Sequence, residues 1–119
     1  MKPESKFWQE VKKNITEISF TRLESWASAG VPDLLCYNKS GNFFTIELKV
    51  SKGDFPKLSP HQISFHVRHP HNTFILQKSL GPWSVKLYEG SKIMQLAKRE
   101  PCACVAEGWT MIQEHLKKI

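Results

Sequence analysis

The sequence predicts a three-layer α/β fold, in which helices cover both faces of a mixed β-sheet. Residues 43–50, FFTIELKV, are rich in aromatic and β-branched side chains, as expected of a strand inside a sheet. A helix separates this strand from the apolar run 73–77, and strands joined through a helix imply a mixed sheet. A chain of 119 residues has room for one hydrophobic core, so we expect a single domain over residues 1–119.

The helices are predicted from apolar periodicity and from their end signals. In residues 4–15, one stripe of the helix is apolar and the lysines lie on the other side. Ser59 and Pro60 are typical of an N-cap and a first helical position, and they open a helix that runs to about His69. Two further helices are expected over residues 91–99 and 109–118.

The strands are predicted from short apolar runs bounded by turn residues. Asn38 to Asn42 makes the turn between the second and the third strand, and Gly81-Pro82 separates the last two. The expected strands cover residues 18–24, 33–37, 43–50, 73–77 and 84–88.

Composition restricts which partners and which cellular location we expect. Lys and Arg total 17 against 11 Asp and Glu, and a net charge of +6 suits a polyanionic partner such as nucleic acid, although charge alone leaves other roles open. The absence of a long apolar run argues against a membrane span, and the N-terminus lacks a secretory signal. We therefore expect an intracellular, cytoplasmic protein with reduced cysteines; the C-x-C spacing at Cys102 argues against zinc.

The strand over residues 43–50 carries two charges where they are costly. Because side chains alternate along a strand, its even-numbered residues form an apolar face, and Glu47 and Lys49 lie together on the other. Asp33 follows Pro32 at the start of the preceding strand, so a hairpin would bring it beside Glu47. Two carboxylates make an oxygen-lined site for Mg²⁺, and Lys49 could act on water or on a phosphate. The competing interpretation is a surface salt bridge on a hairpin.

These residues resemble the PD-(D/E)XK nuclease superfamily, here as Pro32-Asp33 followed by Glu47-Leu48-Lys49. The longer match, from Gly30 through the strand to Leu58-Ser59-Pro60-His61-Gln62, is similar to the VRR-NUC branch, whose members also resemble Holliday junction resolvases. The resemblance covers roughly residues 5–78. It implies a restriction-endonuclease-like fold, Mg²⁺ or Mn²⁺ held by Asp33 and Glu47, and Gln62 as a supporting catalytic residue.

The family also implies an acidic residue on the first helix. Glu10 is the preferred candidate, because it flanks the apolar stripe of that helix and could overlook a cleft at the sheet. Glu24 competes with it, because strand alternation groups it with Arg22. An ordinary surface role is at least as compatible with either glutamate.

Several other residues are candidate DNA contacts. Lysines and an arginine around the proposed site form a plausible phosphate-binding rim, and a tryptophan just before Asp33 is suited to contact the substrate. The candidates are Lys52, Lys57, His61, Arg68 and Trp26.

The expected function is metal-dependent hydrolysis of DNA phosphodiester bonds. The resemblance favours branched DNA and a homodimer, because two symmetric nicks across a junction require two sites. It also suggests a bacterial cell or a phage-infected host. The alternatives are a nicking, flap-cutting or restriction-like nuclease on the same core, and a DNA-binding module without catalysis.

Overall fold

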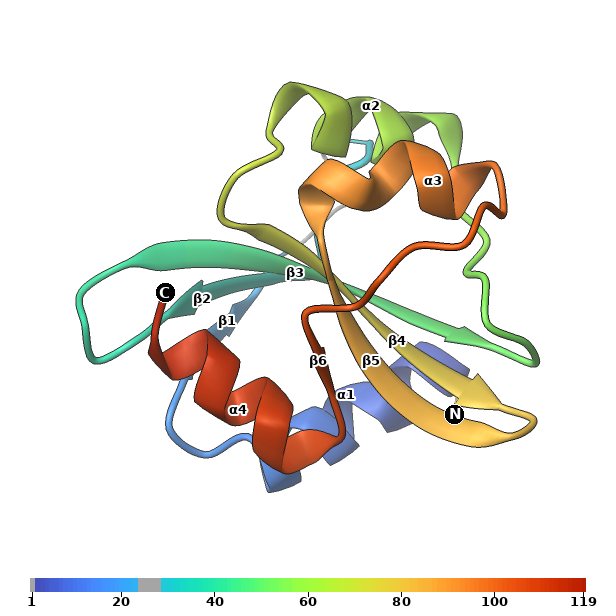
Figure 1. The fold of residues 1–119 in the computed structure, drawn as a ribbon. Coiled ribbons are helices and arrows are strands. Elements are labelled where there is room, and N and C mark those ends of the chain that lie inside the picture. Colours follow the sequence, from blue (N-terminus) through green and yellow to red (C-terminus); the bar gives the residue numbers. More distant parts are fainter. Residues whose placement is uncertain (1, 24–28) are drawn as a thin grey trace.

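The computed structural model describes residues 2–23 and 29–119, and within them the chain alternates helices and strands (Figure 1). The elements, in chain order, are α1 (Pro3–Asn14), β1 (Ser19–Arg22), β2 (Leu34–Tyr37), β3 (Phe43–Ser51), α2 (Pro60–Arg68), β4 (Thr73–Leu80), β5 (Trp83–Glu89), η2 (Gly90–Lys92), α3 (Ile93–Ala97), β6 (Ala106–Glu107) and α4 (Trp109–Lys117).

The described strands form one six-stranded mixed sheet in the order β1-β2-β3-β4-β5-β6. Only the β3–β4 pair is parallel among them, and the other four pairs are antiparallel. A parallel pair needs a crossover connection, which α2 supplies between β3 and β4. The predicted three-layer α/β architecture with a mixed sheet is thus confirmed.

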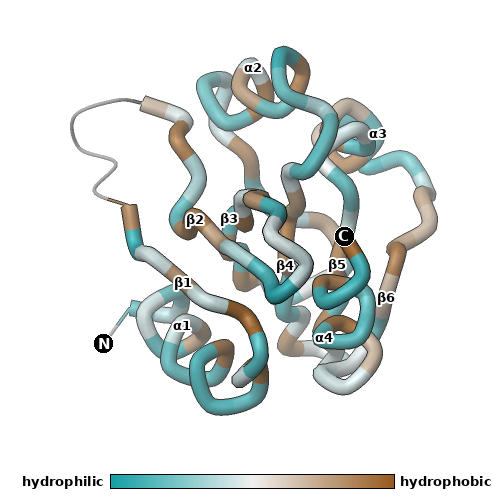
Figure 2. Tube along the Cα trace, turned by 90° about the vertical axis from the view of Figure 1, so that its left-hand side faces the viewer, coloured by the Kyte–Doolittle hydropathy of each residue, from teal (hydrophilic) through white to brown (hydrophobic). Residues whose placement is uncertain are grey.

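Helices cover both faces of the sheet. In Figure 1, α2 and α3 lie above the sheet and α1 and α4 below it. Figure 2 shows the same layering from the side, with hydrophobic stretches along the strands and more hydrophilic turns. The larger core cluster lies between the sheet and the α1 and α4 layer, and its fully buried members include Phe7, Val11, Leu34, Cys36, Ile46, Leu76, Leu87, Ile112 and Leu116. A smaller cluster lies under α2 and α3 and is built on Ile75, Tyr88, Ile93 and Leu96.

The principal helices form where their sequence signals predict them. The apolar stripe of α1 is buried as expected, and it contributes Phe7, Trp8 and Val11 to the larger core cluster. α2 begins with Ser59 as its N-cap and Pro60 at its first position. No described helix has both the length and the apolar character needed to span a bilayer.

Several elements differ in length from the expectation. β1, expected over residues 18–24, covers Ser19–Arg22, and its pairing with β2 ends at the Arg22–Leu34 pair. β4 continues to Leu80, beyond the apolar run, because its last residues pair with β5 up to the Leu80–Trp83 pair. α3 is shorter than expected, since Arg99 has a φ of 58° and lies outside right-handed helical geometry. β6 spans two residues, too few to give a period in the sequence.

Candidate active site

The site lies where β3 continues past the beginning of β2. β2 pairs with β3 only as far as the Leu34–Ile46 pair, so the edge of β3 beyond Ile46 has no pairing from β2. The Leu48 N–H, on this edge, donates a hydrogen bond of 2.8 Å to Asp33 Oδ2. Asp33 thus fills the place of a partner strand, and its carboxylate is fixed at the point where the two strands part.

Glu47 is buried on the face of the sheet under α2. Its side chain is only 3% exposed, which is rare for a glutamate. Oε2 accepts a hydrogen bond of 3.2 Å from Gln62 Nε2, while Oε1 has no hydrogen-bond partner among the described residues. A buried carboxylate oxygen without a partner is costly unless something else binds it.

Gln62 is held in place by the first turn of α2. Its backbone N–H donates to Ser59 Oγ at 3.2 Å, and its Oε1 accepts from the Ser59 N–H at 2.9 Å, a capping box. Because the Ser59 N–H holds the amide oxygen of Gln62, the Nε2 of the same amide is directed at Glu47. Gly30 supports this turn from outside: it has a φ of +84°, and a Cβ there would collide with the carbonyl group of His61.

The two carboxyl groups interact electrostatically. The pKa of Glu47 is raised to about 9, first by burial and then by the close approach of the Asp33 carboxylate. Lys49 acts in the opposite direction, and the charge of Glu4 adds a small further increase in the pKa. At neutral pH the pair therefore retains a proton, as expected when two like charges lie close together. A divalent cation bound there would take the place of that proton.

A basic groove adjoins the carboxylates along the open edge of β3. It has a volume of about 590 Å³, and its lining includes four cationic side chains and one carboxylate. Lys49, two residues after Glu47, projects into it from β3, and the others come from α1, the loop after β3 and the segment after α3. The lining residues are Glu4, Lys49, Val50, Ser51, Lys52, Phe55, Lys57 and Arg99.

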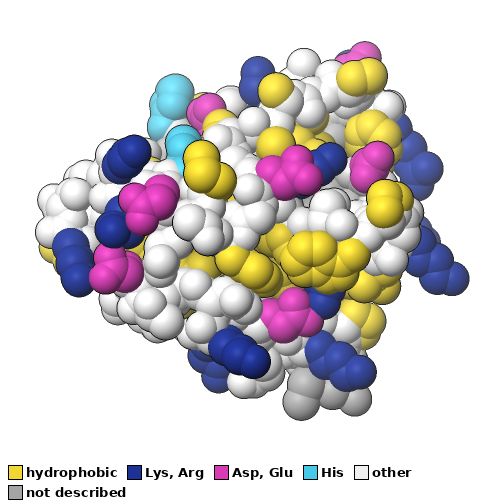
Figure 3. Space-filling view, turned by 60° about the horizontal axis from the view of Figure 1, so that its bottom comes forward, with side chains coloured by type: hydrophobic (Ala, Val, Ile, Leu, Met, Phe, Trp, Pro, Cys, Tyr) yellow, Lys and Arg dark blue, Asp and Glu magenta, His cyan; other side chains and the backbone are white. Residues whose placement is uncertain are grey.

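Glu10 lies apart from the other predicted site residues. It forms an ion pair with Lys78, and both residues line a hollow beside α1. In β4, Lys78 alternates with Gln77, so it belongs to the α1 face of the sheet, whereas Glu47 belongs to the α2 face. The expected position of Glu10 beside the carboxylates is therefore corrected: the sheet separates them. Hydrophobic side chains lie between acidic and basic ones on the α1 and α4 side (Figure 3).

Two residues that line the groove, Glu4 and Arg99, are not predicted from the sequence as site residues. Glu4, in the first turn of α1, is the acidic residue of that helix that lies by the site, since it lines the groove and its charge acts on Glu47. Pro3 at the helix start was the signal that put Glu4 at a helix end rather than on its side. Arg99 lines the groove from a segment distant in sequence, and no local pattern indicated it.

The remaining predicted DNA contacts are dispersed. Lys52 and Lys57 line the groove. His61 is exposed in the first turn of α2, beside Gln62. Arg68 is exposed six residues beyond Gln62, about 9 Å further along the helix axis, and its Nε donates to the Ser64 carbonyl. Trp26 and Glu24 lie outside the described residues.

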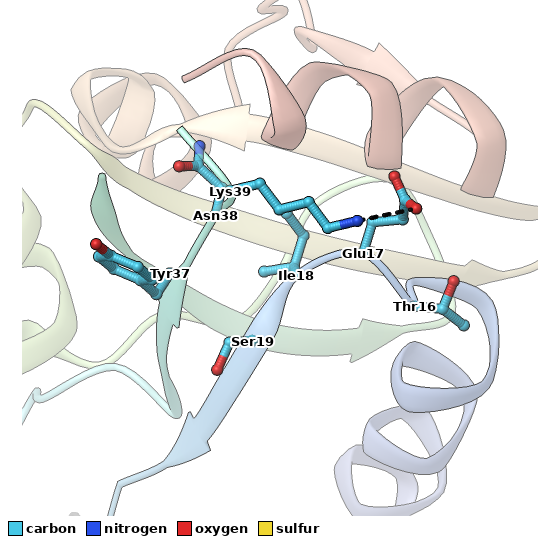
Figure 4. A pocket seen from close by; sticks show the side chains of 7 residues that line it. All are labelled: Thr16, Glu17, Ile18, Ser19, Tyr37, Asn38 and Lys39. Carbon is cyan, nitrogen blue, oxygen red and sulfur yellow. Dashed lines mark ion pairs between the residues drawn. The ribbon is translucent and has the colours of Figure 1, made fainter. Parts of the chain in front are cut away.

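A second hollow, of about 410 Å³, lies where β1 begins and β2 ends, between the segment before β1 and the turn after β2 (Figure 4). Its carboxylate, Glu17, forms ion pairs with Lys39 at 3.5 Å and with Lys117 at 2.9 Å. The hydrogen bond and the charge of Lys117 lower the pKa of Glu17, so its charge is already compensated. This hollow thus lacks the unpartnered groups that distinguish the site around Glu47.

Within residues 2–23 and 29–119, no three His, Cys, Asp or Glu side chains gather as a ready set of metal ligands. The Asp33 and Glu47 carboxylates are a pair, to which a substrate and water would have to add further oxygens. A scan of the chain against models of known protein families finds no match, and neither does a search of curated proteins. The function must therefore be inferred from the chemistry of the site.

Proposed function

We propose that this chain is a metal-dependent endonuclease of the PD-(D/E)XK type, hydrolysing phosphodiester bonds of DNA. The observation that carries the proposal is the Asp33 and Glu47 pair, with an unpartnered buried oxygen on Glu47, on the strand whose Lys49 lines a groove with three further cations. Carboxylates repel a phosphate unless a cation lies between them, whereas lysines and an arginine attract it. A metal ion at the carboxylates and a phosphate in the groove satisfy both requirements.

The donor set fits Mg²⁺ or Mn²⁺. Both are hard cations that prefer carboxylate oxygens and keep several waters, and Asp33 and Glu47 would hold the ion. Glu47 Oε1, buried and without a partner among the described residues, is the oxygen best placed to accept such a ligand. When bound, the ion polarises the phosphoryl group and lowers the pKa of a coordinated water.

The chain's own residues have separate tasks in this proposal. Asp33 keeps its carboxylate at the strand edge through the Leu48 N–H, and Gln62 orients Glu47 through a hydrogen bond. Lys49 follows Glu47 on the same face, and its ammonium stabilises negative charge that develops on the phosphate or helps to deprotonate the water. Lys52, Lys57 and Arg99 neutralise neighbouring phosphates.

Branched DNA is the preferred substrate and a homodimer the preferred assembly, and both follow from the resemblance to junction resolvases. A nicking, flap-cutting or restriction-like nuclease uses the same carboxylates. A DNA-binding module without catalysis is the rival from another class. Which DNA is cut distinguishes among the nucleases, and whether any DNA is cut distinguishes them from the binding module.

Asp33→Asn is the decisive variant. Asparagine keeps an oxygen that can accept the Leu48 N–H but loses the negative charge that holds a cation. We expect cleavage to fall by a hundredfold or more, roughly the loss of several kcal/mol of metal-dependent stabilisation, while DNA binding is retained. The measurement is cleavage of four-way junction, flap, single-stranded and linear duplex DNA, with Mg²⁺ and with a chelator.

Two matched variants serve as controls. Asp54→Asn makes the same change at an exposed aspartate in the loop after β3, and Glu10→Gln neutralises the acid on the opposite face of the sheet. Both should cut DNA as the unaltered chain does. Cutting by Asp33→Asn at the rate of the unaltered chain would exclude the metal site, and binding without cutting on all four substrates would favour the non-catalytic module.

A further inference from the structure

The tip of the β4–β5 hairpin exposes two large apolar side chains. Leu80 and Trp83 pair directly across the two strands, so both lie on the same face of the hairpin. They are 53% and 56% exposed. Trp83 is the most exposed of the three described tryptophans, since Trp8 is buried and Trp109 is half-buried against the core. An exposed aromatic side chain at a hairpin tip adds nothing to the core.

This tip is attached to the end of the basic groove. The Gly81 N–H donates a hydrogen bond of 3.1 Å to the carbonyl oxygen of Lys52, a residue that lines the groove. On the α1 face, Leu80 lines a hollow of about 330 Å³ together with Lys6 and Val50. Val50 lines the groove as well, so the hollow and the groove meet at the end of β3.

Lysines therefore flank the apolar tip. Lys6 and Lys52 are both exposed, and each lies in the lining of one of the two adjoining depressions. Aromatic side chains beside a positively charged path are the arrangement by which proteins bind single-stranded nucleic acid, with phosphates on the cations and a base stacked on the ring. Charge complementarity thus selects a nucleic-acid strand as the occupant.

We propose that Trp83, supported by Leu80, stacks on an unpaired base of the DNA strand whose phosphates lie in the basic groove. The inference rests on the proposed nuclease function and specifies its substrate class. A base inside a duplex is already stacked on both faces, whereas an unpaired base offers a free face to the indole ring, and a blunt duplex offers one only at its two terminal pairs. The substrate is then DNA with unpaired nucleotides along the strand that the groove holds, rather than a continuous duplex.

The β2–β3 hairpin offers a matched control. Phe43 is 60% exposed there and packs on Tyr37, with ring centroids 4.5 Å apart. It lies at the first residue of β3, whereas the groove lies at the other end of the strand. Phe43→Ala therefore removes an equally exposed aromatic ring without touching the proposed path of the DNA.

The test is DNA binding in chelator, which prevents metal-dependent cutting. Fluorescently labelled single strand, duplex with a single-stranded flap, and blunt duplex would each be titrated with the unaltered chain, Trp83→Ala, Trp83→Phe and Phe43→Ala. We expect Trp83→Ala to bind the two DNAs with unpaired bases roughly 5- to 100-fold more weakly, the loss of one stacked base. Blunt-duplex binding should stay unchanged, Trp83→Phe should keep most of the affinity, and Phe43→Ala should keep all of it.

Other outcomes overturn the inference in distinguishable ways. If Trp83→Ala binds all three DNAs as the unaltered chain does, the stacking role is refuted while the nuclease proposal stands. An equal loss on blunt duplex would refute it too, because the effect would not depend on unpaired bases. A change of oligomeric state in sedimentation, with DNA binding intact, would assign the tip to a second copy of the chain. If the unaltered chain binds none of the DNAs in chelator, the stacking inference fails, whereas the nuclease proposal is decided separately by cleavage of the same DNAs with Mg²⁺.

Discussion

The face of the sheet under α1 and α4 buries apolar side chains, whereas the face under α2 and α3 buries polar atoms that find no partner. Five such side-chain atoms occur among the described residues, and all belong to the second face, four on β3 and β4 and one on α2. The larger core cluster lies on the first face. One face thus supplies most of the stability, and the other retains unsatisfied groups where chemistry can use them. The five atoms are Thr45 Oγ1, Glu47 Oε1, His66 Nε2, Gln77 Oε1 and Ser79 Oγ.

The sharpest test of this contrast is the pH dependence of stability in chelator. The folded chain raises the pKa of Glu47 from 4.5 to about 9, so between these values it holds a proton that the unfolded chain has lost. The contribution of Glu47 to the free energy of unfolding should therefore be largest at about pH 4.5 and below, and should be lost as the pH rises to about 9. Urea unfolding from pH 5 to pH 9 measures the slope, and the total change in the free energy of unfolding over this range should exceed the loss caused by truncating one core side chain.

Glu47→Gln supplies the control for that slope. Glutamine has an oxygen that can accept the Gln62 hydrogen bond and does not titrate, so the slope should flatten. Mg²⁺ added near pH 8 should raise the melting temperature of the unaltered chain, because binding to the folded state stabilises it, and should leave Glu47→Gln unaffected. An unchanged slope in the variant would show that Glu47 is not the titrating group.

On the face under α1 and α4, substitutions should change the free energy of unfolding mainly through loss of packing. Ile46 is fully buried in the larger cluster, and Ile46→Ala should lower the free energy of unfolding by about 2–5 kcal/mol. Its neighbour on β3, Thr45, provides a comparison on the other face. Urea denaturation at one fixed pH measures both, and a cost below about 1 kcal/mol for Ile46→Ala would contradict the assignment of stability to this face.

The smallest expected change in the free energy of unfolding is an increase, caused by Thr45→Val. Thr45→Val replaces an unpartnered buried hydroxyl by a methyl group of similar shape. Removing the cost of that hydroxyl should raise the free energy of unfolding by about 1 kcal/mol. A destabilised Thr45→Val variant would mean that a bound water satisfies the hydroxyl, and the contrast between the faces would then be weaker.

The sequence predicts best what depends on neighbours along the chain. β3 and α2 were predicted almost to their ends, because strand alternation and the Ser59-Pro60 cap are local signals. The approach of Asp33 to Glu47 was predictable for the same reason, since a hairpin of known turn fixes the register. Glu4 and Arg99 were not predictable, because they reach the groove through contacts between segments far apart in sequence.

The acidic residue of the first helix shows what helical periodicity alone does not predict. A helical stripe shows which side of α1 meets the sheet but not which end of the helix lies by the carboxylates. The stripe predicts Glu10, on the side of the helix, but in the structure Glu10 pairs with Lys78 on the face opposite Glu47. Glu4, in the first turn of the helix, lies by the groove because α1 passes under the sheet with that turn next to the end of β3.

Both borders of the sheet are formed by short strands: β1 has four residues and β6 has two. A free border is a template on which another molecule can add its own strand, the first step toward fibres, and its danger grows with its length. Arg22 and Glu107 place a charge on each border strand. These two strands thus leave few main-chain groups of their own free for such growth, so we expect them to contribute little to fibre formation at high concentration.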